Sequence, residues 1–199
     1  EDGKQPASVW LRGEKVAEVA AFLGAENGAV VSGKTVEDWF NKAVAPSGVK
    51  LGKTLGDKGV PGFDLTFCAP KSVSLLWGMG ADSSVRSIVD EAHQAAVSQA
   101  LDYLSEHAGY TRKQDPAASK KRLIIEKLAG ISGVKYEHRT SRAGDPHVHS
   151  HVLLANKQLC QDGKARTLDG VSLYHEARAA GMVYQATVRE ILSRKLGVE

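Results

Sequence analysis

The stretch VKYEHRTSRAGDPHVHSHVLLAN, residues 134–156, decides how this chain folds. Residues 134–140 and 147–156 have the composition of β-strands, and residues 141–146 between them are polar and contain glycine and proline. Two such segments around a polar turn are typical of antiparallel neighbours in a sheet. We therefore expect this hairpin to be the centre of the fold.

Four histidines lie on the predicted hairpin. His147, His149 and His151 share one face of their strand, because side chains at positions i and i+2 point the same way, and His138 lies on the facing strand. Neutral imidazole is a good ligand for transition metals, and three histidines with one open coordination position are typical of a catalytic metal site. The spacing alone leaves open which three of the four histidines bind the metal.

The rest of the chain alternates between helical and extended patterns without internal repeats. Apolar residues at helical spacing predict helices at residues 11–23, 35–44, 83–107 and 173–195, with a further short helix after Pro70. Residues 63–67 alternate with period two, and residues 123–125 form a strand that we expect to join residues 134–140 through a glycine-containing turn. His93 and His107 are expected at the surface or at a helix end. The predicted class is α+β, with a central antiparallel sheet that bears the histidines and is flanked by helices.

Length and composition favour a single domain in a reducing compartment. A chain of 199 residues with 42% hydrophobic residues is long enough for one sizeable core. Cys68 and Cys160 are far apart and form no CxxC motif, which favours a cytoplasmic location. The sequence has no apolar run of roughly 18 residues and no signal-peptide core near its start, so we expect neither membrane insertion nor export.

Positive charge is concentrated in one part of the chain. The net charge is only +3, but residues 111–142 contain nine lysines and arginines against three acidic residues. A surface of this kind attracts a polyanion such as DNA and releases counterions when it binds. A solvated basic hairpin without a partner is the alternative.

Two motifs resemble those of a known family. Residues 137–151, EHRTSRAGDPHVHSH, are similar to the metal motif of conjugative relaxases, the mobilisation nickases of the HUH endonuclease superfamily. In that motif one histidine is followed eleven and thirteen residues later by a paired His-x-His. Residues 62–74, GFDLTFCAPKSVS, resemble the family's second signature, an aspartate on a strand before a Pro-Lys-Ser-Val-Ser turn. Weaker similarity covers residues 10–24 and 181–197.

The resemblance implies a function and a metal site. It implies that the metal ligands are His138, His149 and His151, with His147 as a neighbour, and that the ion is divalent Mg, Mn or Zn. Relaxases of this family nick a single DNA strand at a plasmid transfer origin and form a 5′-phosphotyrosyl link. The implied partners are single-stranded origin DNA and other relaxosome or conjugation proteins.

Three further residues receive roles from this resemblance. Asp64 is expected to orient a ligand imidazole or to accept the proton of the attacking tyrosine. Lys71 and Arg142 are expected to contact DNA phosphates. An ordinary strand carboxylate and two solvated charges are the alternatives.

The sequence departs from the family pattern at the nucleophile. The family's nucleophilic tyrosines lie near the N-terminus, on and just after a first strand, and the residues before Trp10 contain no tyrosine and do not resemble that strand. None of the five tyrosines present matches the nucleophile: Tyr103, Tyr110, Tyr136, Tyr174 and Tyr184. Tyr136 shares a strand face with His138, and we expect it to pack or to stack on a base. Residues 1–199 are therefore expected to be a relaxase domain that is truncated at both ends and receives its nucleophile from elsewhere.

Two other functions fit the same residues. One is a metal-containing module that binds single-stranded DNA without catalysis. The other is a metal hydrolase that uses water as its nucleophile on the open metal position.

Overall fold

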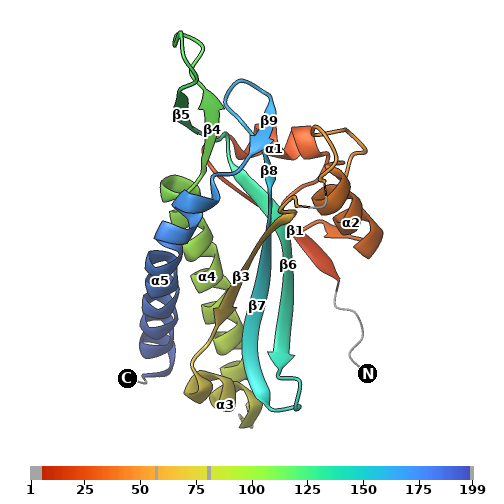
Figure 1. The fold of residues 1–199 in the computed structure, drawn as a ribbon. Helices are drawn as coiled ribbons and strands as arrows, with labels where there is room; N and C mark the ends of the chain where they lie inside the picture. Colours follow the sequence, from red (N-terminus) through yellow and green to blue (C-terminus); the bar gives the residue numbers. More distant parts are fainter. Residues whose placement is uncertain (1–5, 57, 80–81, 198–199) are drawn as a thin grey trace.

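The computed structural model describes residues 6–56, 58–79 and 82–197. Its strands and helices follow one another as β1 (Ala7–Arg12), α1 (Val16–Leu23), β2 (Val30–Val31), α2 (Gly33–Lys42), β3 (Gly62–Cys68), α3 (Lys71–Met79), α4 (Ser83–His107), β4 (Tyr110–Gln114), β5 (Leu123–Lys127), β6 (Ile131–Thr140), β7 (Pro146–Ala155), β8 (Lys157–Leu159), β9 (Ala165–Thr167) and α5 (Gly170–Leu196) (Figure 1). None of the helices in these ranges is long and apolar enough to cross a membrane. Residues 1–5 and 198–199, on which the expected truncation bears, lie outside the described residues.

The predicted hairpin forms the middle of a five-stranded sheet. The strand order is β2-β1-β6-β7-β3, and every neighbouring pair is antiparallel. Within the β6–β7 pair, His138 lies opposite His149 and Tyr136 lies opposite His151. On the other side of β7, Thr66 of β3 also lies opposite His151. The prediction of an α+β fold with a central antiparallel sheet is confirmed.

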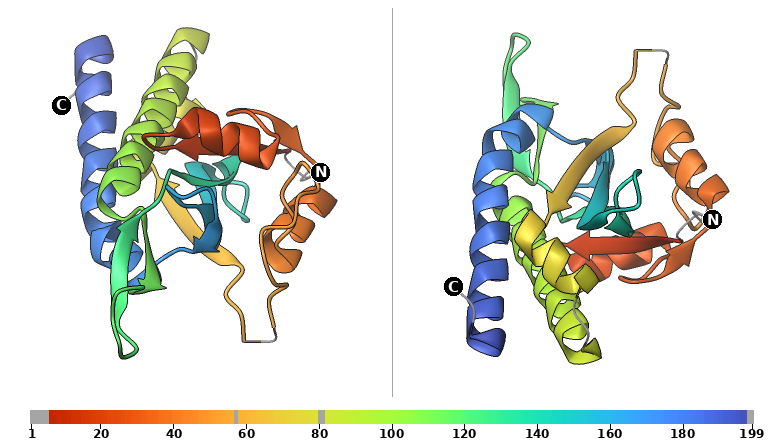
Figure 2. Two further views of the ribbon diagram at one scale, coloured as in Figure 1. Left: turned by 90° about the horizontal axis from the view of Figure 1, so that it is seen from above. Right: turned by 90° about the horizontal axis from the view of Figure 1, so that it is seen from below.

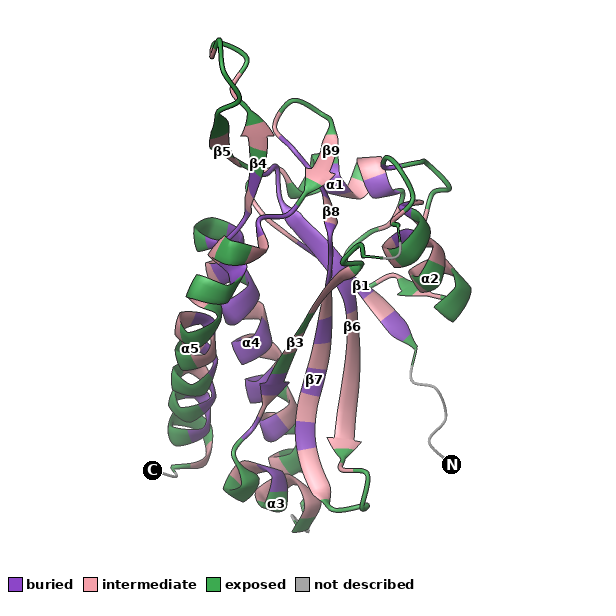
Figure 3. Cartoon of the chain, viewed as in Figure 1, coloured by how far each residue is buried: buried purple, intermediate pink, exposed green. Residues whose placement is uncertain are grey.

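The two faces of the sheet are covered differently. Helices α4 and α5 lie side by side along one face (Figures 1 and 2). Val148, Val152 and Leu154 of β7 are fully buried in the core on that side. Side chains at the alternate positions of the strand point to the other face of the sheet, where a second core lies. Helices α1 and α2 cover only one end of that face. Residues 131–134 of β6 are therefore buried, while residues 135–139 are half-buried (Figure 3).

Two small hairpins extend from the central sheet. Strands β4 and β5 form a two-stranded sheet of their own, and they project from one end of the molecule (Figure 1). The base of this hairpin is attached by an ion pair between Arg112 and Asp169, with 3.0 Å between Nε and Oδ1. The Thr111 hydroxyl also donates to the carbonyl oxygen of Thr167 over 2.7 Å. Strands β8 and β9 form the second hairpin.

The structure corrects the predicted N-terminal helix. Residues 7–12 form strand β1, and helix α1 begins only at Val16 before ending at the left-handed Gly24. The reason lies in the alternation of this segment: Trp10 is buried in the helix-side core, whereas Val9 and Leu11 are buried in the second core. Only an extended chain sends neighbouring residues to opposite faces.

Other boundaries also differ from the predictions. Residues 123–127 pair with β4 and not with β6, so the expected turn from residues 123–125 into residues 134–140 is wrong. Helix α2 begins at Gly33, two residues before the predicted start at residue 35, and is capped by Ser32, whose hydroxyl accepts from the Thr35 amide. The predicted strand at residues 63–67 and the helices after Pro70, at residues 83–107 and near residues 173–195 are confirmed.

Gly133 allows β6 and β7 to approach closely, which leads to a stability prediction. A Cβ atom at this position would collide with the carbonyl oxygen of Leu153 on β7. We therefore expect Gly133→Ala to lower the free energy of unfolding by at least about 2 kcal/mol, measured by urea denaturation. The control is Gly33→Ala in the first turn of α2, where a Cβ meets no atom within 4 Å. Equal midpoints for the two variants would contradict the close approach.

Candidate metal centre and nucleic-acid surface

Three of the four hairpin histidines form a compact triangle on the open face of the sheet. The ring centroids are 5.0 Å apart for His138 and His149, 5.6 Å for His138 and His151, and 5.4 Å for His149 and His151. The fourth ring, of His147, lies 4.4 Å from the His149 ring. Among these four described rings, His147 has no such close pair with His138 or His151. The strand register therefore places His147 at the rim of the triangle.

Hydrogen bonds fix the tautomers of two of these rings. Nδ1 of His151 lies 3.0 Å from Oδ2 of Asp64, and Nδ1 of His149 lies 2.9 Å from the carbonyl oxygen of His147. A carboxylate and a carbonyl only accept, so each Nδ1 carries the proton and donates it. The Nε2 atom of each ring is left with its lone pair, which is the form in which histidine binds a metal.

The positions of the rings fit one metal ion, but their orientations do not. Three imidazoles bound tetrahedrally at about 2.0–2.1 Å would have centroids about 5.2 Å apart, close to the observed separations. Yet no group of three or more His, Cys, Asp or Glu in the described part of the chain is arranged to hold a metal ion. The cause lies in the His138 and His149 rings, which stack with 18° between their planes. Their lone pairs lie in those planes and do not meet.

The ring of His138 is the one with freedom to turn. Among the described residues it has no hydrogen-bond partner, in contrast to the rings of His149 and His151. Its position is set by the backbone register, whereas its orientation depends only on side-chain torsions. The orientation of this ring can therefore change without a movement of the strand.

The electrostatic surroundings of His149 favour its neutral form. Burial lowers the pKa of His149 below its usual value, and the neighbouring rings of His147, His138 and His151 lower it further. The hydrogen bond to the His147 carbonyl acts in the opposite direction and raises it. A lowered pKa increases the fraction of His149 that is neutral near neutral pH and therefore able to bind a metal.

The two predicted phosphate contacts lie together at the far end of the hairpin. Lys71 begins α3, and its Nζ donates to the carbonyl oxygen of Pro146 over 3.1 Å. Arg142 is exposed on the turn between β6 and β7, which precedes Pro146. Asp64 lies on β3, where its carboxylate meets His151. The structure thus brings Asp64 to the histidines and places both cations at the turn.

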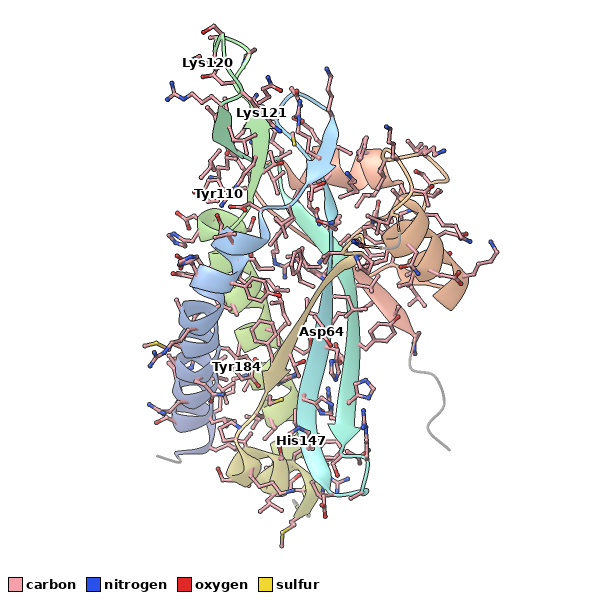
Figure 4. All side chains as sticks on the ribbon, in the orientation of Figure 1. Asp64, Tyr110, Lys120, Lys121, His147 and Tyr184 are labelled. Carbon is pink, nitrogen blue, oxygen red and sulfur yellow. The ribbon has the colours of Figure 1, made fainter. Side chains whose placement is uncertain are left out.

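The basic stretch of the sequence is divided between two surfaces. On β6, Lys135 pairs with Glu137 and Arg139 pairs with Asp90 of α4, each over 2.7 Å, so these cations face the helices. The tip of the β4–β5 hairpin carries the exposed Lys120 and its neighbours Lys121 and Arg122 (Figure 4). The single basic surface expected from the sequence is therefore wrong, because strand alternation turns part of its charge inward.

The sequence analysis missed a polar cluster behind the histidines. His93 is only 1% exposed, not at the surface as expected. It lies between the hydroxyls of Tyr184 and Ser150, each 2.7 Å from one of its ring nitrogens. The spacing of Val89, His93 and Val97 along the buried stripe of α4 was the signal that identifies it as a core residue.

Comparisons with known proteins agree with this arrangement. A family model described as TrwC relaxase matches residues 1–199. The chain is 30% identical over 173 residues to the multifunctional conjugation protein TraI of Escherichia coli, an alignment that covers 80% of this chain and 9% of that protein. The TraI protein of strain K12 is 31% identical over 138 residues, covering 65% of this chain and 7% of that protein.

Solved structures show the same fold. A metal-bound structure of the conjugative relaxase TrwC in complex with oriT DNA superposes with a TM-score of 0.78 and 26% identity, covering 100% of this chain and 65% of that chain. TrwC complexed with a 27-mer DNA that comprises the recognition hairpin and the cleavage site gives a TM-score of 0.77 at 26% identity, covering 97% of this chain and 63% of that chain.

The extent of these matches defines what they support. The chain spans less than a tenth of the TraI proteins and less than two thirds of the TrwC chains. The family model, by contrast, matches the chain from its first residue to its last. The chain belongs to the TrwC relaxase family.

Proposed function

We propose that this chain forms the phosphate-holding part of a relaxase active site. In this proposal the enzyme nicks one DNA strand at a transfer origin and keeps the 5′ end as a phosphotyrosyl link, leaving a free 3′-hydroxyl. The attacking tyrosine comes from outside these 199 residues. Rejoining the strand by the reverse reaction then needs no external energy source, because the phosphotyrosyl bond preserves the phosphodiester energy.

The observation that carries this proposal is the triangle of His138, His149 and His151. Its ring separations match a three-histidine metal centre, and two of the three rings already have Nε2 free. A divalent ion bound there supplies neutralisation of the phosphate charge and orientation of its non-bridging oxygens. A rotation of the His138 ring out of its stack with His149 is the adjustment we expect when a metal binds.

The residues of this chain hold and orient the reacting groups. Asp64 accepts a hydrogen bond from the Nδ1–H group of His151 and so keeps that ring in one tautomer and one orientation. Lys71 and Arg142 offer positive charge at the hairpin turn, where the strand that leaves the site would pass. All three roles are proposals that rest on position and charge.

Two tyrosines near the triangle, Tyr136 and Tyr184, support an external nucleophile. Tyr184 is 1% exposed and hydrogen-bonded to His93 on the helix side of the sheet, so its hydroxyl faces away from the triangle. Tyr136 lies on the triangle's face, but burial raises the pKa of its phenol and disfavours the phenolate. We propose that Tyr136 packs against the site or stacks on a base.

We further propose that the β4–β5 hairpin contacts the DNA at a distance from the cleavage point. Lys120 and Lys121 lie at one end of the molecule and His147 near the other (Figure 4). The DNA bound by TrwC comprises a recognition hairpin and a cleavage site, two parts that suit two separate contact regions. Two-stranded ribbons are a known means of entering a DNA groove.

The metal centre leads to a prediction about ligand identity. His149→Ala is expected to weaken Mn²⁺ or Zn²⁺ binding at least ~100-fold in calorimetry, because it removes one of three ligands. His147→Ala is the control, with a change under about threefold. Alanine at position 147 retains the carbonyl oxygen that accepts from His149. Equal losses in both variants would exclude this ligand set.

The proposed chemistry is tested on the complete gene product. Incubation with Mn²⁺ and single-stranded DNA that spans the cognate transfer origin and carries a 3′ label should give a labelled covalent adduct on a denaturing gel. Chelation of the metal by EDTA should abolish it. Labelled free fragments would support a hydrolase, and retention without cleavage would support a binding module.

The hairpin leads to a third prediction. The double variant Lys120→Ala, Lys121→Ala should weaken DNA binding and lower the slope of log Kd against log salt by about 1.5 to 2, measured by fluorescence anisotropy. The control is Lys50→Ala, Lys53→Ala, which removes the same charge from exposed lysines in the loop after α2. Identical slopes for the two double variants would refute the hairpin contact.

A further inference from the structure

A chain of buried hydrogen bonds runs directly behind the histidine triangle. Nδ1 of His93 lies 2.7 Å from the Tyr184 hydroxyl, and Nε2 of His93 lies 2.7 Å from the Ser150 hydroxyl. None of these three side chains is more than 1% exposed. The chain therefore joins α4, α5 and β7 through polar atoms that water does not reach.

The strand end of this chain lies between two candidate ligands. Ser150 separates His149 from His151 on β7, and its side chain points to the opposite face of the sheet. Because one backbone pleat carries all three residues, the position of the Ser150 hydroxyl restricts the directions in which both histidine side chains leave the strand. A displacement of this pleat would move both rings together.

The same layer also reaches the strand that carries Asp64. Phe67 of β3 lies opposite Ser150 in the sheet, and its ring packs on that of Tyr184 with 5.5 Å between centroids. The Tyr184 ring therefore contacts both His93 and β3. This layer holds β7 and β3 in a fixed relation directly behind the contact between His151 and Asp64.

The imidazole of His93 has the hydrogen-bonding capacity that this place requires. Burial lowers the pKa of His93 to about 4, and the nearby cations Arg139 and Lys135 also lower it, whereas Glu137 raises it. The ring is therefore neutral at neutral pH, with one N–H group and one lone pair. It donates to one hydroxyl and accepts from the other, so both of its nitrogens are satisfied.

We propose that His93 is a positioning residue of the metal centre: through the Ser150 hydroxyl it fixes the β7 pleat that carries His149 and His151. This inference rests on the proposed function, since it concerns the geometry of the same three histidines. His93 lies in the core on α4, and it affects the metal centre through its buried hydrogen bond to Ser150 and through the strand backbone that joins Ser150 to the two neighbouring histidines.

The matched pair of variants is Ser150→Ala and Ser132→Ala. Ser132 is 1% exposed on the adjacent strand β6, and its hydroxyl donates to Gln158 over 2.8 Å. Each substitution deletes one buried hydroxyl with one hydrogen bond, so the two variants should lose similar stability. Only Ser150 lies between candidate ligands, so only its loss should reach the metal.

The measurements are Co²⁺ affinity and the Co²⁺ d–d absorption spectrum, with thermal denaturation in parallel. Ser150→Ala should weaken Co²⁺ binding about tenfold and change the d–d band, as the loss of supporting interactions around metal ligands does. Ser150→Thr, which keeps the hydroxyl, should restore both. Ser132→Ala should lower the melting temperature but leave affinity and spectrum at the wild-type values. Tyr184→Phe retains the hydrogen bond from His93 to Ser150. It should change the Co²⁺ affinity and the d–d spectrum in the same direction as Ser150→Ala, but by less.

The outcomes separate this inference from the proposed function. Co²⁺ binding by the wild-type chain with identical spectra for Ser150→Ala and Ser132→Ala would overturn the positioning role alone. A wild-type chain that takes up no Co²⁺, Mn²⁺ or Zn²⁺ would overturn the metal centre, and the positioning role with it. If Ser150→Ala does not fold, an unchanged Co²⁺ spectrum in His93→Phe, which removes the hydrogen bond from His93 to Ser150, overturns the inference.

Discussion

The antiparallel register of β6 and β7 is the constraint on which the site depends. His138 faces His149 across this pair, and a slip of one residue would send one strand's histidines to the helix side. Two features oppose such a slip. Gly133 admits the Leu153 carbonyl at a distance that no larger residue allows, and a register irregularity between His138 and Thr140 adjusts the strand before its turn.

The two faces of the sheet are covered unequally, so the face that packs most of the core is not the face that carries the histidine triangle. Helices α4 and α5 seal one face with apolar residues, while α1 and α2 cover only one end of the other face. The histidine rings that we propose as metal ligands therefore lie on a half-buried surface, backed by a fully packed one. The charged residues Lys135, Glu137 and Arg139 on the helix-facing side of β6 neutralise one another and Asp90.

Sequence patterns predicted the parts of the fold that local periodicity determines. The long helix at residues 83–107 follows from the spacing of its apolar residues, and the pairing of the histidine strands follows from the short polar turn between them. Strand β1 was missed because Val9, Trp10 and Leu11 form a continuous apolar run whose neighbouring residues enter two different cores, so this run lacks the apolar–polar alternation that marks a strand. The partner of β5 and the burial of His93 depend on contacts between distant segments, which a single sequence does not contain. The spacing of the four histidines left open which three would group together; the resemblance to the relaxase metal motif implied the three of the triangle, but not the orientation of their rings.

The separation of the β4–β5 hairpin from the central sheet has an evolutionary consequence. This hairpin makes its ladder hydrogen bonds within itself and is attached near its base by Arg112 and Thr111. Exposed residues near its tip can therefore be substituted without disturbing the strand register that aligns the histidines. If the hairpin contacts DNA as proposed, a lineage carrying this fold can change its sequence preference while the histidine triangle stays unchanged.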